Sequence, residues 1–230
     1  MSKSILIMGE SGGGKTTSLR NLDPATTYII DCDGKGLNWK GWKEQYSVQK
    51  KNYFATDYPQ LVTKALYALN GQDLDKDGTP KPSDKFKEFL KFKVVVIDTI
   101  NALMVAQEGR ERLTKGYDKW ADLAWNIYDI LNLSLKLRDD LTIILMAHCQ
   151  TDRTEDGYMW TRVKTNGRKL DKIVPESKLN TVILARKDED GYHFVIKDAN
   201  STVKVPMGAF GEETVIDNDI TKVIKALEDF

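Results

Sequence analysis

The strongest constraint on this chain is one octapeptide, GESGGGKT at Gly9–Thr16, which directly follows the apolar run Ile5–Met8. It fits the pattern G-x-x-x-x-G-K-[ST], in which glycines let backbone N–H groups fold around phosphate oxygens. The apolar run predicts a buried strand before the loop, and Lys15–Asn21 is expected to form a helix after it, ended by Pro24. The sequence therefore predicts a phosphate-binding loop between a strand and a helix.

Each position of this loop has an expected role. The amides of residues 9–14 bind phosphate oxygens, and the positive end of the following helix points at the same oxygens. Lys15 reaches the β- and γ-phosphates, and the Thr16 hydroxyl binds Mg²⁺. The alternative interpretation is a glycine-rich surface loop without a ligand. The predicted nucleotide-binding residues are Gly9, Glu10, Ser11, Gly12, Gly13, Gly14, Lys15, Thr16 and Thr17.

A buried strand that ends in a carboxylate supplies the second half of the expected site. Val94–Ile97 is a continuous apolar run, typical of a central parallel strand, and Asp98 follows it. In P-loop proteins an aspartate at such a strand end holds Mg²⁺, usually through water. Many buried strands end in aspartate, so Asp98 gains its meaning from the phosphate loop upstream. ATP and Mg²⁺ are the ligands expected at this pair of motifs.

Strands and helices alternate over the first 150 residues. Thr26–Ile30 and Thr142–Ala147 have the apolar, β-branched character of further strands, whereas Tyr58–Asn70 and Trp120–Leu137 carry apolar residues at helical spacing. Gly71–Ser83 is rich in glycine, proline and aspartate and is expected to be a loop. Its aspartates match the start of a calcium-binding loop, but prolines interrupt that pattern, so a solvated acidic loop is favoured. The alternation predicts an α/β fold with a mainly parallel sheet flanked by helices.

The later part of the chain differs in character. Residues 151–172 are polar and basic and are expected to form a loop, while Thr181–Ala185 and His193–Lys197 predict a β-hairpin. Asp219–Glu228 predicts a closing helix, capped by Asn218 or by Asp219. The expected organisation is a single domain over residues 1–230 with three parts, namely a nucleotide-binding core over residues 1–150, a loop over residues 151–172, and a hairpin with its closing helix over residues 181–230.

Composition excludes several classes of protein. The chain has 34 Lys+Arg and 34 Asp+Glu, and this balance argues against coating nucleic acid by bulk charge. No apolar run approaches the roughly 20 residues that span a bilayer, and the first one is too short for a signal-peptide core. Cys32 and Cys149 each lie at the end of an apolar run and are expected to be buried free thiols of a cytoplasmic protein.

Three segments resemble those of RecA-type recombinases. VVVIDTINAL at Val94–Leu103 is similar to their metal-binding strand, and YIIDCD at Tyr28–Asp33 to the strand that ends in the catalytic acid. IILMAH at Ile143–His148 is similar to the strand that ends in a polar γ-phosphate sensor. The length, the Asp-x-Asp-Gly sequence and the C-terminal hairpin resemble small phage-encoded RecA-like ATPases associated with single-strand annealing. The resemblance implies a RecA-like P-loop ATPase in the host cytoplasm.

The resemblance assigns roles to Asp33 and His148. Asp33 takes the position of the carboxylate that activates water and His148 that of the sensor, where RecA carries Glu and Gln. The chemistry agrees, because hydrolysis needs a carboxylate near the attacking water and a donor near the γ-phosphate. Alternatives remain for Asp31 as a turn or capping residue and for His148 as a structural histidine. The expected catalytic residues are Lys15, Asp33, Asp98 and His148.

A basic segment follows the sensor strand, where RecA-like proteins have a DNA-binding loop. Residues 162–172 hold five cations and one acid, and Tyr158 and Trp160 precede them. Cations for the phosphate backbone and aromatic rings for base stacking are typical of single-stranded DNA binding, although a solvated loop is the alternative. The expected DNA-binding residues are Arg162, Lys164, Arg168, Lys169 and Lys172.

RecA-like assemblies complete the nucleotide site in trans with basic residues, so the resemblance implies self-association into a ring or filament. A cation at the transferring phosphate stabilises charge that develops in the transition state. The alternative is an ordinary charged hairpin. The candidates for this role are Arg186, Lys187 and Lys197.

The leading hypothesis is a Mg²⁺-dependent ATPase that acts on single-stranded DNA in phage-type recombination or replication, without membrane association. A nucleotide-gated binding module with little hydrolysis is the second hypothesis, motivated by the shorter acid at Asp33. A small-molecule kinase is the third, because Arg153 and Arg162 flank a loop that could act as a lid.

Overall fold

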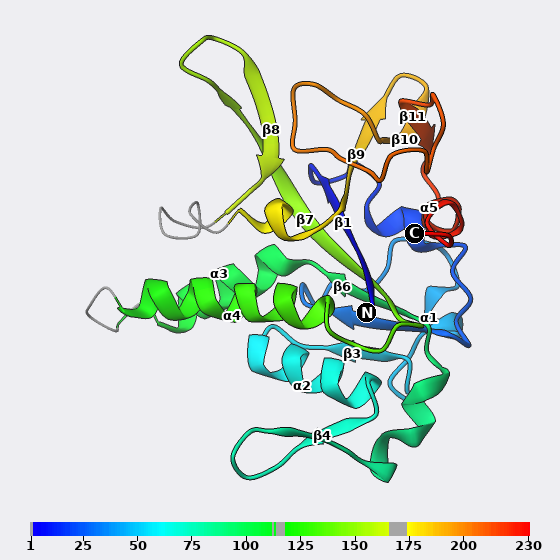
Figure 1. The fold of residues 1–230 in the computed structure, drawn as a ribbon, viewed down its shortest axis with the longest axis vertical. Helices are drawn as coiled ribbons and strands as arrows, with labels where there is room; N and C mark the ends of the chain where they lie inside the picture. The colour runs from blue at the N-terminus through cyan, green and yellow to red at the C-terminus, as the bar shows by residue number, and fades with distance from the viewer. Residues whose placement is uncertain (1, 112, 114–117, 166–173) are drawn as a thin grey trace.

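The computed structural model describes residues 2–111, 113, 118–165 and 174–230. Its centre is a nine-stranded sheet with the strand order β11-β10-β9-β1-β7-β6-β2-β3, and β8 pairs with β7 outside this path. Figure 1 shows β7 and β8 extending together away from the rest of the molecule. The strands are β1 (Lys3–Gly9), β2 (Thr27–Asp31), β3 (Tyr53–Ala55), β6 (Val94–Asp98), β7 (Thr142–Arg153), β8 (Met159–Val163), β9 (Thr181–Asp188), β10 (Gly191–Val195) and β11 (Val215–Asp217).

The central strands are parallel, so their carboxyl ends meet at one edge of the sheet. β1 pairs with β7 on one side and with β9 on the other, while β6 pairs with β7 and β2. In this register Gly9 lies opposite His148, and Asp31 lies opposite Asp98. The start of the glycine-rich loop, His148 and two aspartates therefore share one edge.

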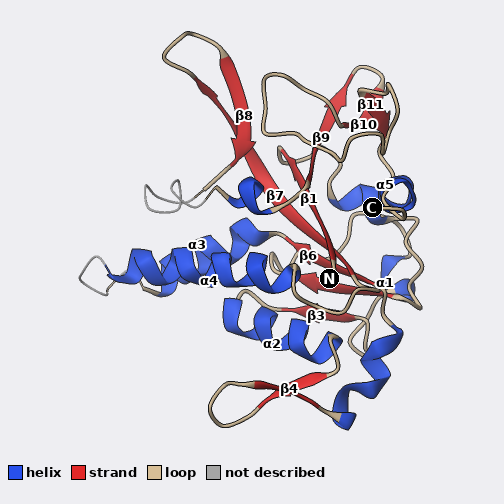
Figure 2. Cartoon of the chain, viewed as in Figure 1, coloured by secondary structure: helices blue, strands red, loops and turns tan. Residues whose placement is uncertain are grey.

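Helices cover both faces of the sheet, as Figure 2 shows. On one face α2, α3 and α4 pack over Leu6, Met8 and Ile97; on the other, η1 and α5 pack over Ile5 and Ile7. Side chains alternate along a strand, so two buried faces require continuous apolar runs. The helices are α1 (Trp42–Gln45), α2 (Pro59–Leu69), α3 (Ile100–Arg110), α4 (Asp118–Ser134), α5 (Ile220–Ala226) and the 3₁₀ helices η1 (Thr16–Leu19), η2 (Asp84–Lys91) and η4 (Pro175–Lys178).

The α/β fold predicted from the sequence is confirmed. The predicted strands are present, the two long helices correspond to α2 and α4, and the C-terminal hairpin is β9–β10 with β11 as a third antiparallel strand. The closing helix α5 is capped by Asp219, whose side chain accepts a hydrogen bond from the Thr221 amide at 3.0 Å. Asn218, the alternative cap, is therefore not used for that purpose.

The predicted helix over Lys15–Asn21 is wrong in length and type. Only Thr16–Leu19 is helical, and it is a 3₁₀ helix. The Ser18 amide donates to the carbonyls of Gly14 and Lys15, and the Ser18 hydroxyl also donates to the Lys15 carbonyl at 2.6 Å. A single tight turn has a small dipole, so it contributes less than the predicted longer helix would to the positive potential at the glycine-rich loop.

The predicted loop over Gly71–Ser83 is a small hairpin of β4 (Gln72–Leu74) and β5 (Pro80–Pro82). Its prolines are tolerated because this two-stranded sheet is separate from the central one. The aspartates serve the turn and pair with lysines, with Asp75 at 2.7 Å from Lys81. Within the described ranges no group of three or more His, Cys, Asp or Glu residues could hold a metal ion.

The predicted loop over residues 151–172 is also corrected. β7 does not stop at Ala147 but continues to Arg153 and pairs with β8, so the first part of this segment is a hairpin. Residues 166–173 lie outside the described residues. None of the helices in the described part of the chain is long and apolar enough to cross a membrane.

Candidate nucleotide-binding site

Lys15 lies folded across the glycine-rich loop. Its Nζ atom donates hydrogen bonds to the Gly9 carbonyl at 2.8 Å and the Glu10 carbonyl at 2.9 Å, and the side chain is buried. Burial lowers the pKa of Lys15, against the opposing effect of the negative charge on Asp98. The ammonium group therefore has neutral carbonyl partners in place of a paired carboxylate, and it is available to phosphate oxygens.

Two glycines of the loop show why side chains are excluded there. A Cβ atom on Gly9 would approach the Ala185 carbonyl oxygen of β9 to 2.6 Å, so the loop starts in direct contact with the neighbouring strand. Gly14 has φ +95°, a backbone conformation that other residues adopt only with strain. The packing of β1 against β9 and the turn before Lys15 both require glycine.

Thr16 and Asp98 meet at the end of β6. The Thr16 hydroxyl donates to Asp98 Oδ2 at 2.7 Å, and Asp98 is buried. Burial raises the pKa of Asp98 to about 6, although the hydrogen bond from Thr16 opposes this shift. The hydroxyl of the adjacent Thr99 is buried and, within the described residues, has no hydrogen-bond partner.

This arrangement fits Mg²⁺. A hydroxyl and a carboxylate oxygen lie side by side, and Mg²⁺ takes oxygen ligands of this kind. Mg²⁺ needs only one or two protein oxygens, because substrate phosphates and water complete its shell. Thr16 and Asp98, the two predicted metal ligands, are therefore brought together as expected.

The two acids that follow β2 have different environments. Asp31 is buried, and its carboxylate accepts hydrogen bonds from the Gly34 and Gly36 amides, both at 2.8 Å, and from the Tyr53 hydroxyl at 2.5 Å. Asp31 is thus the turn residue that its alternative interpretation described. Asp33 has no such backbone partners in the described structure and forms an ion pair with Lys35 at 2.9 Å. Asp33 lies close enough to Lys15 and Asp98 for its negative charge to influence their pKa values.

His148 lies within β7, opposite Gly9 at the end of β1. Burial lowers the pKa of His148, and the charge of Lys15 lowers it further. The negative charge of Asp33 influences the pKa values of His148, Lys15 and Asp98, so these four predicted residues form one electrostatic cluster. A histidine next to an ammonium group is held neutral at physiological pH and can donate one hydrogen bond.

Asn101 is a site residue that the sequence reasoning missed. It lies in the first turn of α3, three residues after Asp98, and is buried. Its Oδ1 atom accepts a hydrogen bond from the His148 amide, and its Nδ2 atom donates to the Lys164 carbonyl, both at 2.7 Å. A polar residue in an otherwise apolar helix start was the available signal.

Comparison with known families agrees with this geometry. A family model described as an AAA domain matches residues 1–202. The chain belongs to the AAA domain family. The assignment makes it a nucleotide-binding domain of the P-loop ATPase type, and it implies ATP and Mg²⁺ as ligands. A comparison with curated proteins finds no match.

Two of the three basic residues predicted to act in trans lie beside the phosphate loop of this same AAA domain. Arg186 and Lys187 line a cavity of about 430 Å³ together with residues 10–13 of the loop. Lys197 is separate, because it follows the far end of β10 and donates to the Gly211 carbonyl at 2.6 Å. The three residues are therefore not brought together.

The cysteines of the AAA domain are free. Cys32 is buried, as predicted, whereas Cys149 is only half-buried and lines the cavity beside the phosphate loop. Burial raises the pKa of Cys149, and the charge of Glu10 raises it further. Both effects keep this thiol protonated.

The structure describes two of the five residues that were predicted to bind DNA, Arg162 and Lys164. Arg162 lies on β8, where its side chain pairs with Asp152 at 3.0 Å, and Lys164 is exposed just after β8. Arg168, Lys169 and Lys172 lie outside the described residues. Tyr158 and Trp160 are exposed on the β7–β8 hairpin of the AAA domain, as the sequence reasoning required of stacking residues.

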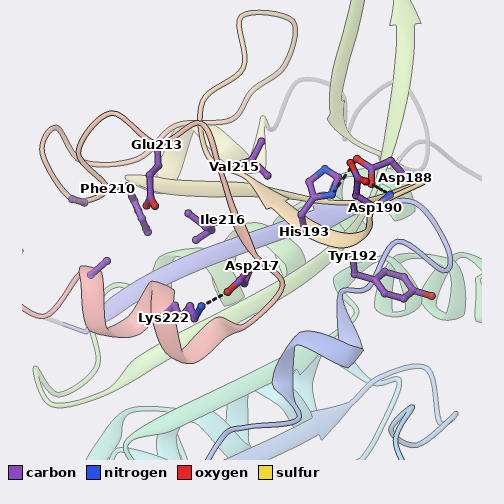
Figure 3. Close-up of a pocket in the computed structure, with 12 residues that line it drawn as sticks. Asp188, Asp190, Tyr192, His193, Phe210, Glu213, Val215, Ile216, Asp217 and Lys222 are labelled. Carbon is purple, nitrogen blue, oxygen red and sulfur yellow. Dashed lines mark hydrogen bonds and ion pairs between the residues drawn. The ribbon is translucent and has the colours of Figure 1, made fainter.

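A second cavity, of about 810 Å³, lies at the β10–β11 side of the AAA domain (Figure 3). Its lining includes Asp188, Asp190, Glu213 and Asp217. Of these acids, Asp217 forms an ion pair with Lys222, and Asp188 lies 3.3 Å from His193 Nδ1. A lining of carboxylates repels phosphates, so this cavity does not compete with the glycine-rich loop as the phosphate site.

Proposed function

We propose that the chain is a Mg²⁺-dependent, RecA-like ATPase that acts on single-stranded DNA in phage-type recombination or replication. The observation that carries the proposal is the strand β7. Its first half lies between the strands that carry the phosphate loop and Asp98, and its second half forms an exposed hairpin. One element therefore connects a nucleotide site with a surface suited to nucleic acid.

The first step is binding of the triphosphate. The amides of the glycine-rich loop donate to phosphate oxygens, and Lys15 exchanges its two carbonyl partners for the β- and γ-phosphates. Thr16 and Asp98 hold Mg²⁺ through oxygen atoms that already lie 2.7 Å apart. When bound, Mg²⁺ neutralises the negative charge that the leaving phosphates carry.

The second step is attack by water on the γ-phosphorus. Asp33 orients the water and accepts its proton, while the bond from the γ-phosphorus to its bridging oxygen breaks to give ADP and inorganic phosphate. Asp33 is suited to this role because, unlike Asp31, its carboxylate is not engaged by backbone amides in the described structure. Its present partner Lys35 is exposed and can be replaced by water.

The third step is communication with DNA. His148 donates a hydrogen bond to the γ-phosphate. When hydrolysis releases this phosphate, the hydrogen bond is lost and the β7 backbone at His148 shifts. Asn101 holds both the His148 amide and the Lys164 carbonyl, so a shift at His148 reaches the segment that leaves β8. This gives the chain a physical connection between the nucleotide and the basic residues 162–172.

The DNA surface that we propose is the β7–β8 hairpin with the basic segment after it. Tyr158 is 69% exposed and Trp160 lies two residues further, so both rings can stack on unpaired bases. Arg153 and Lys164 are exposed and add positive charge for the phosphate backbone. The proposal includes Arg168, Lys169 and Lys172 as further phosphate contacts.

Self-association into a ring or filament is part of the proposal. Arg186 and Lys187 project from the end of β9 into a cavity that borders the phosphate loop, which places positive charge at an edge that a second copy could share. A cation that joins the γ-phosphate from outside would stabilise the transition state.

A second candidate function is a nucleotide-gated binding module with little hydrolysis. The ion pair between Asp33 and Lys35 favours it, because a neutralised carboxylate is a weaker base. Multiple-turnover phosphate release by the parent protein would exclude this second function.

The deciding experiment measures phosphate release from ATP with and without single-stranded DNA, together with DNA affinity over a salt series. We expect turnover that depends on Lys15 and Asp33, and DNA binding that weakens and loses salt dependence when Arg168→Ala and Lys169→Ala are combined. Parent-level turnover in both Lys15→Ala and Asp33→Asn would contradict the mechanism. Unchanged DNA affinity in the double variant across the salt series would remove DNA from the proposal.

A further inference from the structure

Asn218 carries a buried amide whose hydrogen-bonding capacity is unused. Its side chain is 4% exposed, and neither its Oδ1 nor its Nδ2 atom has a partner in the described part of the chain. A buried amide without partners costs stability, so such groups are few in native proteins and each calls for an explanation. The neighbouring acids are engaged, since Asp217 pairs with Lys222 and Asp219 caps α5.

The position of Asn218 is fixed against the turn that follows the phosphate loop. Arg20 donates to the Asn218 carbonyl at 2.7 Å, and Asn21 donates to the Asp219 carboxylate at 2.7 Å. These contacts join segments almost 200 residues apart in sequence. They hold the Asn218 amide beside Gly14, at the end of the phosphate loop that precedes Lys15.

Gly14 of the phosphate loop touches both Asn218 and Tyr192. A Cβ atom on Gly14 would lie 2.8 Å from Tyr192 Cδ1 and 3.0 Å from Asn218 Nδ2. Tyr192 is 44% exposed, and the Lys187 ammonium group lies 5.3 Å from its ring centroid. Figure 3 shows the ring of Tyr192 directed away from His193 and Asp188, on the other side of β10. An aromatic ring and an unpaired amide thus adjoin the same glycine.

We propose that Tyr192 and Asn218 form the base subsite of the phosphate loop and select adenine over guanine. The inference rests on the proposed function, in which that loop binds a nucleoside triphosphate. The exposed ring of Tyr192 turns outward and stacks on the base, which uncovers the amide of Asn218. These two residues thereby give the expected preference for ATP a physical basis in this chain.

The preference for adenine follows from hydrogen-bond chemistry. The Asn218 amide offers one acceptor, Oδ1, and two donor hydrogens on Nδ2. Adenine presents the N6 donor beside a ring-nitrogen acceptor, so an asparagine pairs with it through two hydrogen bonds. Guanine presents two acceptors, O6 and N7, along the equivalent edge, and the Oδ1 atom would face one of them without a hydrogen.

The test compares three ligands, Mg·ATP, Mg·GTP and Mg·tripolyphosphate, by isothermal titration calorimetry on the full chain. The parent protein should bind ATP on the order of 10- to 100-fold more tightly than GTP, the range that a good bidentate pair gives. Asn218→Asp, which keeps the shape but removes both donor hydrogens, and Asn218→Leu should each reduce this ratio to roughly 2 or less, on the same principle. Tyr192→Ala should weaken ATP and GTP alike by about tenfold, since stacking tolerates any base.

Tripolyphosphate reports the phosphate loop alone, so its affinity shows that each variant is folded. The matched control is Asn180→Leu, an exposed asparagine away from this subsite, which should keep the parent ratio. Equal affinity of the parent protein for ATP and GTP, or an unchanged ratio in both Asn218 variants, would overturn the base subsite while leaving the phosphate site intact. Absence of binding to all three ligands would overturn the proposed function and this inference together.

Discussion

The two halves of β7 lie in different environments. The first half, Thr142–Ala147, is hydrogen-bonded to β1 and β6 on its two sides and is almost entirely buried. From Cys149 to Arg153 the strand pairs with β8, and its side chains become progressively exposed. His148 lies at the point where one environment gives way to the other.

The difference teaches how one strand can serve two kinds of chemistry. In the buried half water is scarce, so charges shift one another's pKa values and a carboxylate can be tuned. In the exposed half charges are screened and contacts are individually weak, which suits the nucleic-acid surface that we propose there. Substitutions in the two halves should therefore have effects of different size and kind.

The largest effect is expected at the phosphate loop. Lys15→Ala removes the ammonium group that faces the β- and γ-phosphates, and ATP turnover should fall on the order of 10³-fold, as when one preorganised charge donor is lost. Phosphate release measured at saturating DNA gives the readout. Lys40→Ala removes an exposed lysine far from the loop and should leave turnover unchanged. An equal loss of turnover in both variants would indicate an effect of net charge and not a specific role of Lys15.

Asp33→Asn should lower turnover by about 10²-fold while ATP binding is retained, because the amide keeps the shape but cannot accept a proton. Single-turnover phosphate release and ATP titration separate the two quantities. Asp190→Asn, an exposed acid on the β9–β10 turn, is the control. Weaker ATP binding with an unaltered chemical step would instead assign Asp33 to ligand binding.

The pH response of the buried half should follow Asp98. Burial raises the pKa of Asp98 to about 6, and Mg²⁺ requires the ionised carboxylate, so Mg·ATP affinity should fall about tenfold per pH unit below 6. Titrations from about pH 5 to about pH 8 test this, and Asp98→Asn should flatten the profile. A parent profile that stays flat across pH 6 would rule out Asp98 as the titrating metal ligand.

The stability of the ligand-free protein should depend on Asp98 in the opposite direction: it should rise, and not fall, as pH decreases. The pKa of Asp98 is higher in the folded chain than the ordinary value of 3.8 for an aspartate carboxyl group. Protonation is thus favoured in the folded state, and this group adds stability to the ligand-free protein as pH falls from about 6 toward 4. Urea unfolding of the parent protein and of Asp98→Asn isolates this contribution.

Substitutions on the hairpin that the exposed half of β7 forms with β8 should change the affinity for DNA and leave the other properties unchanged. Tyr158→Ala combined with Trp160→Ala should weaken single-stranded DNA affinity by about tenfold, because two stacking platforms are lost, and should leave turnover without DNA unchanged. Fluorescence anisotropy with a labelled oligonucleotide measures it. Met159→Ala on the same hairpin is the matched control, and an equal loss there would argue against stacking.

The smallest effect is expected at the junction. Asn101→Ala removes the two hydrogen bonds that tie His148 to Lys164, so stimulation of turnover by DNA should fall severalfold, in the range of roughly 2- to 30-fold that coupling residues give. Turnover without DNA serves as the reference. Asn126→Ala, which breaks one hydrogen bond between α4 and α3, should preserve stimulation. An equal loss of stimulation in the two variants would contradict a specific role of Asn101 in connecting His148 with Lys164.

Local patterns predicted the phosphate loop, Asp98 and the parallel sheet because each depends on residues close in sequence. The roles of Asp31 and Asp33 could be told apart only from the conformation of the turn, in which backbone amides donate hydrogen bonds to the Asp31 carboxylate and not to that of Asp33. The continuation of β7 was missed because its last residues are polar and carry no alternating apolar pattern. Asn101 and Asn218 act through partners 47 and 198 residues away, which no local pattern reveals.

The length of β7 has a mechanical consequence. The stretch from His148 to Arg153 reaches roughly 20 Å beyond the sheet at about 3.3 Å per residue. In the mechanism that we propose, a rod of that length acts as a lever with its fulcrum at His148, so a tilt of about 5° there would sweep the tip through roughly 2 Å. A displacement too small to disturb the packed core is thereby amplified into one comparable with the spacing between stacked bases.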